Sequence, residues 1–526
     1  MEAETVADPD LIEAGEALLA ARSTGDIARI AEIVDRWGVD LAHSPYASVL
    51  YDVAAELPLD LGAARPGLAF RFEDIGRLPI GTTPVGLPRT HQEARAEAAS
   101  NGDVRLRQAL LPLITRRRLG RFDEAMSIVR AATPLAQAST YPWYGGKSQI
   151  LPYWHLQSGV TAQVAGDLDT ARRLFLEAWT HRTRDPYGFV ARGTAGKLAQ
   201  QDAFCGDRDS SATWLARAQE AGRRADLWVD HFVESNLTMT TAIHAIDGLD
   251  PRAESHLHET LHPSQRSEQW TFFLWLFVEQ ALTQGDTGRA RRYVDDALAA
   301  RAPELARAGL AAGLVQLVRG EIHLAMGQGH QALADIADAP DVAGMTFALR
   351  ARTLLLADQP SAALAEVAAL TASPTSSSRA LTESLLVAAV AHLHLDDRAA
   401  AVDAMRRAMA EVHEQQAPRL LATVSRAALR DLAADVPQLE PALALLEERG
   451  IGEIYPTTVQ LIAITDRERD LLRDLGSDRT LAEIAASNFV SVNTIRTHLA
   501  NLRKKLSAKS RDEVLARARE LGLLDG

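Results

Sequence analysis

The feature that most constrains the fold of this chain is a pattern that recurs about every 40 residues. Each copy has a Gly or an acidic residue at a turn, a small or aliphatic residue five positions later, an apolar residue four positions further on, and usually a small residue three beyond that. The clearest copy places Gly166, Ala171, Phe175 and Ala178 at these positions. Other copies begin at Gly120, Gly206, Gly248, Gly285, Gly327, Asp358 and Asp396.

This repeat predicts one pair of helices per copy. The turn ends the first helix, and the small residue lets the second helix pack closely against it. Stacked pairs bury one continuous core, so that 526 residues need not form a single oversized globule. Aromatic residues make up only 5% of the chain, which also favours helices over sheets. We therefore expect an all-α protein whose body is an α-solenoid of helix pairs.

The net charge of −13 is distributed unevenly along the chain. Residues 465–526 contain 12 Lys/Arg and 10 Asp/Glu, a balance of +2, which leaves −15 on residues 1–464. Within residues 491–511 there are six basic side chains and no acidic one: Arg496, Arg503, Lys504, Lys505, Lys509 and Arg511. Such a local concentration of positive charge suits binding to phosphate. The acidic character of the whole chain therefore does not exclude nucleic acid as a partner.

Capping residues mark the starts of four short helices near the C-terminal end. Three of them have the S/T-x-x-E pattern of a capping box, and these are Thr465 with Glu468, Thr480 with Glu483, and Ser510 with Glu513. Ser491 can cap a further helix without a glutamate. The caps predict helices near 466–475, 481–487, 492–506 and 511–521, with a tight turn at 487–490. The second and third helices would form a helix-turn-helix.

The third of these helices has two different faces. One is an apolar stripe that should pack on the other helices, and it consists of Ile495, Leu499, Leu502 and Leu506. The opposite stripe is polar and free of carboxylates: Asn493, Thr497, Ala500 and Lys504, flanked by Arg496, Asn501 and Arg503. An α-helix fits the DNA major groove, where Arg and Asn pair with base edges while Lys and Thr hold phosphates. The competing interpretation is that the basic residues form only a solvated surface.

Nearly all of residues 464–524 resembles a LuxR-type helix-turn-helix domain. The matching stretches are 465–468, 483–485, 491–499 and Lys505-Leu506, followed by Arg511. The resemblance implies that Arg496, Thr497 and Ala500 approach bases, while Thr494 and Lys505 lie near phosphates. The candidate DNA-binding residues are therefore Ser491, Asn493, Thr494, Arg496, Thr497, Ala500, Asn501, Arg503, Lys504 and Lys505.

This sequence departs from the LuxR-type pattern at two places. Ala500 is shorter than the polar residue often found at that position, so one base contact is expected to be apolar or missing. Residues 476–480 lack the usual Gly-x-Ser-Asn run, but Thr480 can replace that cap.

The helix-pair pattern resembles tetratricopeptide repeats and, because its period is longer, the looser arrays of MalT-like sensor domains. We expect four segments. Residues 1–100 form a helical cap or divergent repeat with a Pro/Gly-rich connection, and residues 101–450 form a repeat domain for sensing or interaction. Residues 451–464 form a linker, and residues 465–526 form the DNA-binding domain.

Two motifs resemble catalytic ones, but we interpret neither as a site. The segment from His258 to His262 matches the zinc-binding pattern H-E-x-x-H, yet Pro263 follows at once and must end the helix there. Residues 145–148 resemble the end of a phosphate-binding loop, but Tyr141 stands where its first glycine is required. We expect no enzyme activity, no catalytic residues, no cofactor and no metal.

These features predict a sequence-specific transcription regulator. Its expected partners are double-stranded DNA, RNA polymerase, and a ligand or protein effector on the repeat domain, and we expect it to bind DNA as a homodimer. A single cysteine, Cys205, and the lack of an apolar run long enough for a bilayer predict a cytoplasmic protein without membrane contact. The alternatives are a repeat scaffold with a degenerate helix-turn-helix and, third, an enzyme. The acidic array could also mask the basic helix until an effector or dimerisation releases it.

Overall fold

A computed structural model describes residues 9–41, 44, 46–56, 90, 92–95, 102–140, 150–185, 189–222, 230–260 and 268–524, except 302, 304, 463 and 478. Every regular element in this described part is a helix, as the sequence predicts. None of these helices has the length and apolar character needed to cross a membrane.

The first described residues form a small helical group with its own core. It contains α1 (Pro9–Thr24), α2 (Ile27–Leu41) and α3 (Ala47–Glu56). Leu18, Ile30 and Leu50 are buried between them. Gly25 turns the chain between α1 and α2 with φ of +69°. The Pro/Gly-rich stretch at 57–88 lies outside the described residues.

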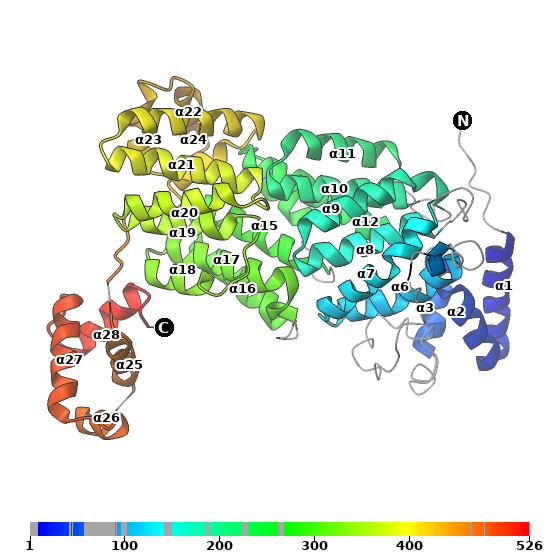
Figure 1. The fold of residues 1–526 in the computed structure, drawn as a ribbon, viewed down its shortest axis with the longest axis horizontal. Coiled ribbons are helices and arrows are strands. Elements are labelled where there is room, and N and C mark those ends of the chain that lie inside the picture. Colours follow the sequence, from blue (N-terminus) through cyan, green and yellow to red (C-terminus); the bar gives the residue numbers. More distant parts are fainter. Residues whose placement is uncertain are drawn as a thin grey trace. The chain divides into compact units, whose positions relative to one another are not determined.

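Eight helix pairs follow among the described residues, in the register that the sequence pattern predicts. They are α6 (Gly102–Arg118) with α7 (Phe122–Ala138), α8 (Leu151–Ala165) with α9 (Leu168–Thr180), α10 (Val190–Cys205) with α11 (Arg208–Glu220), α12 (Asp230–Asp247) with α13 (Ala253–Glu259), α15 (Trp270–Thr283) with α16 (Thr287–Ala299), α17 (Gly309–Ala325) with α18 (Gly329–Ile336), α19 (Met345–Leu356) with α20 (Pro360–Ala372), and α21 (Ser378–His394) with α22 (Arg398–Glu414). The two helices lie side by side in pairs such as α10 with α11 and α21 with α22 (Figure 1).

The turn within a pair uses a left-handed backbone, which explains the glycine at most repeat starts; at the turn of Gly248 the left-handed residue is Leu249, with φ of +57°. Gly166, between α8 and α9, has φ of +94°, a conformation that glycine adopts at little cost. Asp167 follows and caps α9, because its side chain accepts a hydrogen bond from the backbone of Thr170. At two later turns Asp358 and Asp396 take the same left-handed conformation, each with φ of +58°. The acidic turn residues of the pattern are thus conformational equivalents of its glycines.

The small residues of the pattern lie where the two helices of a pair approach most closely. Ala171, Phe175 and Ala178 of α9 are fully buried against α8. A Cβ atom added at Gly159 of α8 would lie 2.5 Å from the Phe175 ring, so only glycine fits there. First helices such as α8 are buried around almost their whole circumference, whereas α9 buries one stripe. This difference is typical of an inner and an outer helix in each pair.

The chain divides into two compact units. One contains residues 1–244, 255–273 and 300–311, and the other contains residues 245–254, 274–299 and 312–526. After α22 the second unit continues through η6 (Pro418–Thr423), α23 (Arg426–Ala433) and α24 (Leu439–Glu448). It ends with α25 (Asp466–Leu475), α26 (Leu481–Ser487), α27 (Val492–Lys505) and α28 (Arg511–Glu520).

A buried charge cluster lies in the second unit, and no sequence pattern indicated it. Asp247 at the end of α12 accepts hydrogen bonds from Arg379 of α21 at 2.6 and 2.9 Å, and from Arg419 of η6 at 3.3 Å. Arg419 also pairs with Glu279 of α15 at 2.6 Å. Burial alone raises the pKa of Asp247, but the two guanidinium groups outweigh burial and lower the pKa to about 2.

The two catalytic-looking motifs do not form a described site. Helix α13 ends at Glu259, which is consistent with the expected end of the helix near Pro263, and His258 is exposed. His262 lies outside the described residues, as do residues 145–148.

Candidate DNA-binding site

The four C-terminal helices begin and end within one residue of the predicted bounds, because local side-chain caps fix where they start. Thr465 and Thr480 each form a complete capping box, with Glu468 and Glu483 respectively. The Ser491 hydroxyl caps α27 by accepting a hydrogen bond from the backbone of Thr494 at 3.1 Å.

The third predicted capping box is only half formed. The Ser510 hydroxyl accepts from the Glu513 backbone at 3.1 Å, so α28 does have its N-cap. The Glu513 carboxylate, however, accepts from the backbone N–H of Lys509 at 2.5 Å instead of that of Ser510. The carboxylate therefore accepts from the residue before the one that the capping-box pattern predicts. The helix still begins at Arg511, as predicted.

The apolar stripe of α27 faces the core of this four-helix domain, as predicted. Ile495, Leu499, Leu502 and Leu506 are buried in one cluster with residues of α25, α26 and α28. This packing fixes the rotation of α27 about its own axis. The opposite side of the helix must therefore face away from the domain.

The residues on that opposite side form what we call the α27 polar face. Its exposed members are Asn493, Arg496, Thr497, Ala500, Asn501 and Lys504. Contacts within the helix pre-position some of these side chains: Arg496 Nη1 donates to Asn493 Oδ1 at 3.4 Å, and Thr497 Oγ1 donates to the Asn493 carbonyl at 3.0 Å. The α27 polar face carries cations and amides but no carboxylate, which is the composition that base edges and phosphates require.

The remaining predicted residues lie around this face. Ser491 is exposed at the helix start, while Thr494 and Arg503 are half-buried. The hydroxyl groups of Ser491 and Thr494 lie 2.8 Å apart. The structure therefore brings the ten predicted residues together on one helix and its cap.

Comparison with known proteins agrees with this geometry. Residues 463–518 match the model of the family described as bacterial regulatory proteins, luxR family. The spore germination protein GerE of Bacillus subtilis is 36% identical over 62 residues, which are 12% of this chain and 84% of GerE. This chain belongs to the luxR family. The luxR-family segment makes it a DNA-binding regulator of transcription.

Two further relatives share the luxR-family segment with this chain. The probable csgAB operon transcriptional regulatory protein of Salmonella typhimurium is 40% identical over 69 residues, which are 13% of this chain and 32% of that protein. The CsgBAC operon transcriptional regulatory protein of Escherichia coli has the same identity and coverage. The chain thus spans about a third of the length of these two regulators.

Lys505, one of the predicted DNA-binding residues, is exposed but forms an ion pair within the domain. Its ammonium group lies 2.7 Å from Oε2 of Glu468, whose side chain is only 4% exposed. Burial raises the pKa of Glu468, but hydrogen bonds from Lys505 and Thr465 outweigh burial and hold the pKa below its usual value. In the luxR-family domain this lysine therefore links the end of α27 to the capping box of α25.

Arg511 also has a structural part in the luxR-family domain. Its guanidinium group donates to the carbonyl oxygens of Leu475 at 2.8 Å, Ser477 at 2.6 Å and Arg479 at 2.9 Å. These bonds connect the start of α28 with the C-terminal end of α25 and the loop that follows. Arg511 therefore belongs to the scaffold and not to the α27 polar face.

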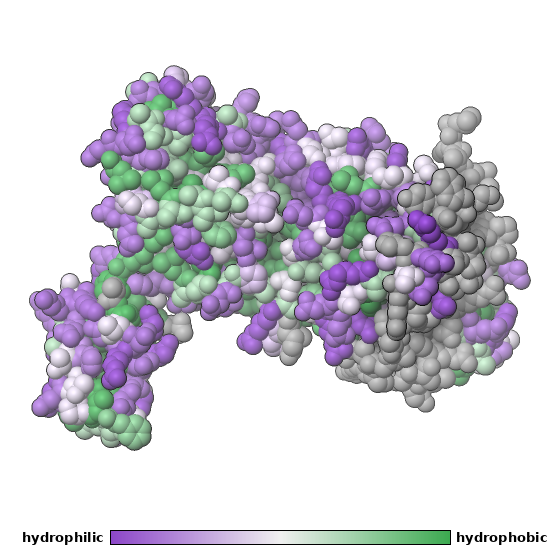
Figure 2. Space-filling model, in the orientation of Figure 1, coloured by the Kyte–Doolittle hydropathy of each residue, from purple (hydrophilic) through white to green (hydrophobic). Residues whose placement is uncertain are grey.

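Phe489 is an exposed residue that the sequence analysis did not single out. It lies in the turn between α26 and α27, its φ is +54°, and it is 96% exposed. Figure 2 shows an apolar patch at the end of the luxR-family domain where α26 lies, and Phe489, Ala482 and Ala486 are exposed apolar residues of this segment. An aromatic residue in a polar turn between two helices is unusual, and this signal in the sequence could have indicated that Phe489 is exposed.

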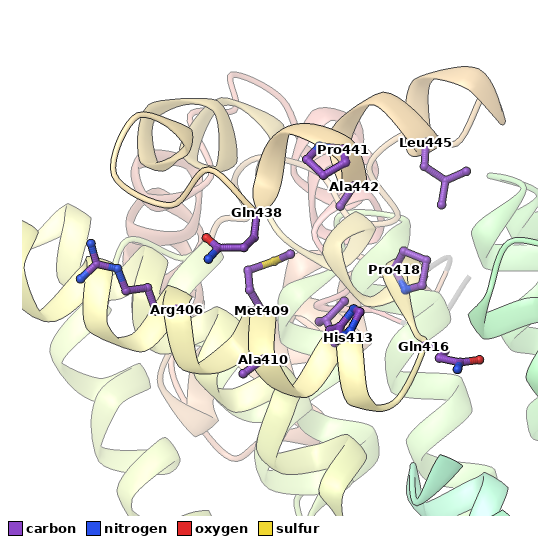
Figure 3. A pocket seen from close by; sticks show the side chains of 11 residues that line it. Arg406, Met409, Ala410, His413, Gln416, Pro418, Gln438, Pro441, Ala442 and Leu445 are labelled. Atoms are coloured by element: carbon purple, nitrogen blue, oxygen red, sulfur yellow. The ribbon is translucent and has the colours of Figure 1, made fainter. Parts of the chain in front are cut away.

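The repeat region contains an open groove between α22 and α24. Its volume is about 650 Å³, and its lining includes Met409, Val412, Pro418 and Leu445. Figure 3 shows Met409 and His413 on α22 facing Pro441 and Ala442 on α24. The volume lies within the range of roughly 300–1,000 Å³ that is typical of small-molecule sites.

Proposed function

We propose that this chain is a sequence-specific transcriptional regulator that reads DNA with the α27 polar face and senses a ligand or a protein partner with its repeat region. The observation that carries the first part is the exposed, carboxylate-free α27 polar face on a helix whose rotation is fixed by a buried apolar stripe. Arg496 and Asn493 supply the side-chain types that pair bidentately with guanine and adenine in the major groove.

DNA binding should be tested with sites mapped across the genome, followed by titration of one mapped site at several salt concentrations. Arg496→Ala should weaken binding to that site by about 1–3 kcal/mol and relax base preference at one position, because Arg496 would read a base. Lys504→Ala should weaken all sequences alike and reduce the salt slope by about 1, because Lys504 would contact phosphate.

Arg473→Ala is the matched control, because Arg473 is an exposed arginine of the same domain that lies on α25. It removes one positive charge away from the α27 polar face and should change base preference at no position. Equal binding by wild type, Arg496→Ala and Lys504→Ala would contradict the proposal. That result would favour the second candidate, a repeat scaffold whose terminal domain does not engage DNA.

The groove between α22 and α24 supports the sensing part of the proposal. Its lining is largely apolar, with His413 and Gln416 as polar groups that could orient a ligand. A compound that occupies the groove should raise the Tm of the wild type and not that of Ala442→Trp, whose indole would fill it. The tetratricopeptide-like and MalT-like character of the repeats belongs to this proposal, since such arrays commonly bind peptides, proteins or small ligands.

The remaining expectations also belong to the proposal. Two-fold DNA sites are common for helix-turn-helix proteins, so we propose that two copies bind half-sites about one helical turn apart. Contact with RNA polymerase and a cytoplasmic location would follow from a role in transcription. Footprinting of the mapped sites tests the dimer, because a single protected half-site would contradict it.

A further inference from the structure

Three potential metal ligands lie close together in the first unit. They are His155 of α8, Glu177 of α9, and His181, the residue that caps the C-terminal end of α9. One ligand atom from each residue lies within 4.8 Å of the other two. His181 Nε2 and Glu177 Oε2 are 3.8 Å apart, and the two imidazole rings face each other with centroids 6.0 Å apart and planes inclined by 20°.

His155 is the observation that points to a ligand. Its side chain is buried, with 7% exposure, and neither ring nitrogen has a hydrogen-bond partner. A buried polar group without a partner costs about 1–3 kcal/mol, so proteins seldom retain one unless something satisfies it. A metal ion held with Glu177 and His181 would satisfy one of the two nitrogens.

Burial favours the neutral form of both imidazoles, which is the form that binds a metal ion. Burial, and next His181, lower the pKa of His155 to about 3. Burial, and next the positive charge of Arg184, also lower the pKa of His181, while Glu177 raises it. Neutral imidazole is the ligand form, so no proton has to leave the histidines at neutral pH. The Arg184 charge also opposes a bound cation, and the Glu177 carboxylate offsets that effect.

We propose that His155, Glu177 and His181 bind a divalent transition-metal ion of the zinc type. Zn²⁺ prefers imidazole and carboxylate donors, and two histidines with one glutamate are a known ligand set for it. In a tetrahedral site with bonds of about 2.0–2.1 Å, neighbouring ligand atoms lie roughly 3.4 Å apart. His181 Nε2 and Glu177 Oε2, at 3.8 Å, are already close to this separation, and a ligand pair at the 4.8 Å limit of the cluster would have to close by about 1.4 Å. Three protein ligands leave the fourth position for water or another ligand.

The ion would connect the two helices of one repeat. His155 comes from the buried inner helix α8, while Glu177 and His181 lie one helical turn apart on α9. Metal binding would thus fix the distance between the two helices at the end of the pair. This proposal does not depend on the DNA-binding function, because every ligand belongs to the first unit.

The test uses untagged, full-length protein that has been treated with a chelator and then titrated with Zn²⁺ by calorimetry. The wild type should bind one ion with these ligands and gain Tm with rising Zn²⁺ concentration. Glu177→Gln and His181→Asn should each weaken Zn²⁺ binding by more than 10–100-fold, which is the loss typical when a residue that hydrogen-bonds to a metal ligand is replaced. Glu177 is half-exposed, with 50% side-chain exposure, so its variant should retain the fold.

His258→Ala is the matched control, because His258 is an exposed histidine next to Glu259 in the same unit. It should leave the affinity unchanged. Co²⁺ provides a second measurement: intense visible bands indicate four- or five-coordination in the wild type, and they should be lost in Glu177→Gln and His181→Asn. The proposal is overturned if folded ligand variants bind Zn²⁺ as the wild type does, or if His258→Ala removes the binding.

Discussion

Glu321 of α17 is a buried carboxyl group that interacts electrostatically with Glu279 and Arg419 of the buried charge cluster. Its side chain is buried, and its Oε2 atom has no hydrogen-bond partner. Burial, and next the negative charges of Glu279 and Glu383, raise the pKa of Glu321 well above its usual value, whereas Arg352 and Arg419 act in the opposite direction. The folded protein therefore keeps a proton on Glu321 at a pH at which the unfolded chain has lost it.

Glu321→Gln should therefore stabilise the protein at neutral pH. The pKa of Glu321 is higher in the folded protein than in the unfolded chain. Below the unfolded pKa, Glu321 therefore does not lower the free energy of unfolding. As the pH rises from the unfolded toward the folded pKa, it lowers that free energy progressively. Glutamine resembles the protonated form and has no such cost. Thermal unfolding should give a higher Tm for the variant near pH 7 and nearly equal Tm values near pH 4.

Glu383→Gln is the control for this prediction. Glu383 accepts a hydrogen bond from Arg352 at 2.9 Å, and glutamine there removes the negative charge that neutralises this buried arginine. This variant should lower the Tm at pH 7, since breaking a buried pair costs about 3–5 kcal/mol. A Glu321→Gln variant that is less stable than the wild type at pH 7 would contradict our interpretation of the cluster.

At the scale of the element, Arg511 connects two helices of the luxR-family domain through backbone carbonyl groups. Arg511→Ala should lower the stability of this domain by about 2–3 kcal/mol, because hydrogen bonds from a charged donor are worth roughly 1.5–3 kcal/mol. Arg519→Ala, which removes an exposed arginine of the same helix, should change stability by less than about 0.5 kcal/mol. Denaturant unfolding of residues 455–526 measures both, and equal stability of the two variants would exclude the connecting role.

Helix starts were predictable from the sequence, whereas contacts between helices were not. A cap acts over three residues, so Thr465, Thr480 and Ser491 reveal where their helices begin. The Lys505–Glu468 pair joins residues that are 37 positions apart, and only the fold brings them together. The sequence therefore predicted the bounds and the exposed polar face of α27, but not that Lys505 is paired with Glu468.

The same limit applies to His155 and His181. Short motifs such as H-E-x-x-H find metal ligands on one helix, but here one ligand comes from α8 and the other two come from α9. The burial of His155 and the absence of a partner for its ring are properties of the packed helix pair. No pattern along the chain could have indicated them.

At the scale of the whole molecule, the balance of −15 on residues 1–464 against +2 on residues 465–526 bears on control. We expect the isolated luxR-family domain, residues 455–526, to bind DNA more tightly than the full chain at low salt, because the acidic repeats repel DNA or mask α27. The domain has its own hydrophobic core, so it can be studied alone. The difference should shrink between about 0.05 and about 0.2 M salt as charges are screened. Equal affinity at every salt concentration would contradict this expectation.

The Lys505–Glu468 pair also has a consequence for the thermodynamics of association. When an unpaired lysine binds a DNA phosphate, a condensed counterion is released into solution. A lysine that leaves an internal carboxylate to do so gains less, because that carboxylate then attracts a cation from solution. Of the six basic residues in 491–511, Lys505 is paired with an acid and Arg511 is bonded to carbonyl groups. The entropy gained from released ions should therefore correspond to fewer cations than the six basic residues of this segment.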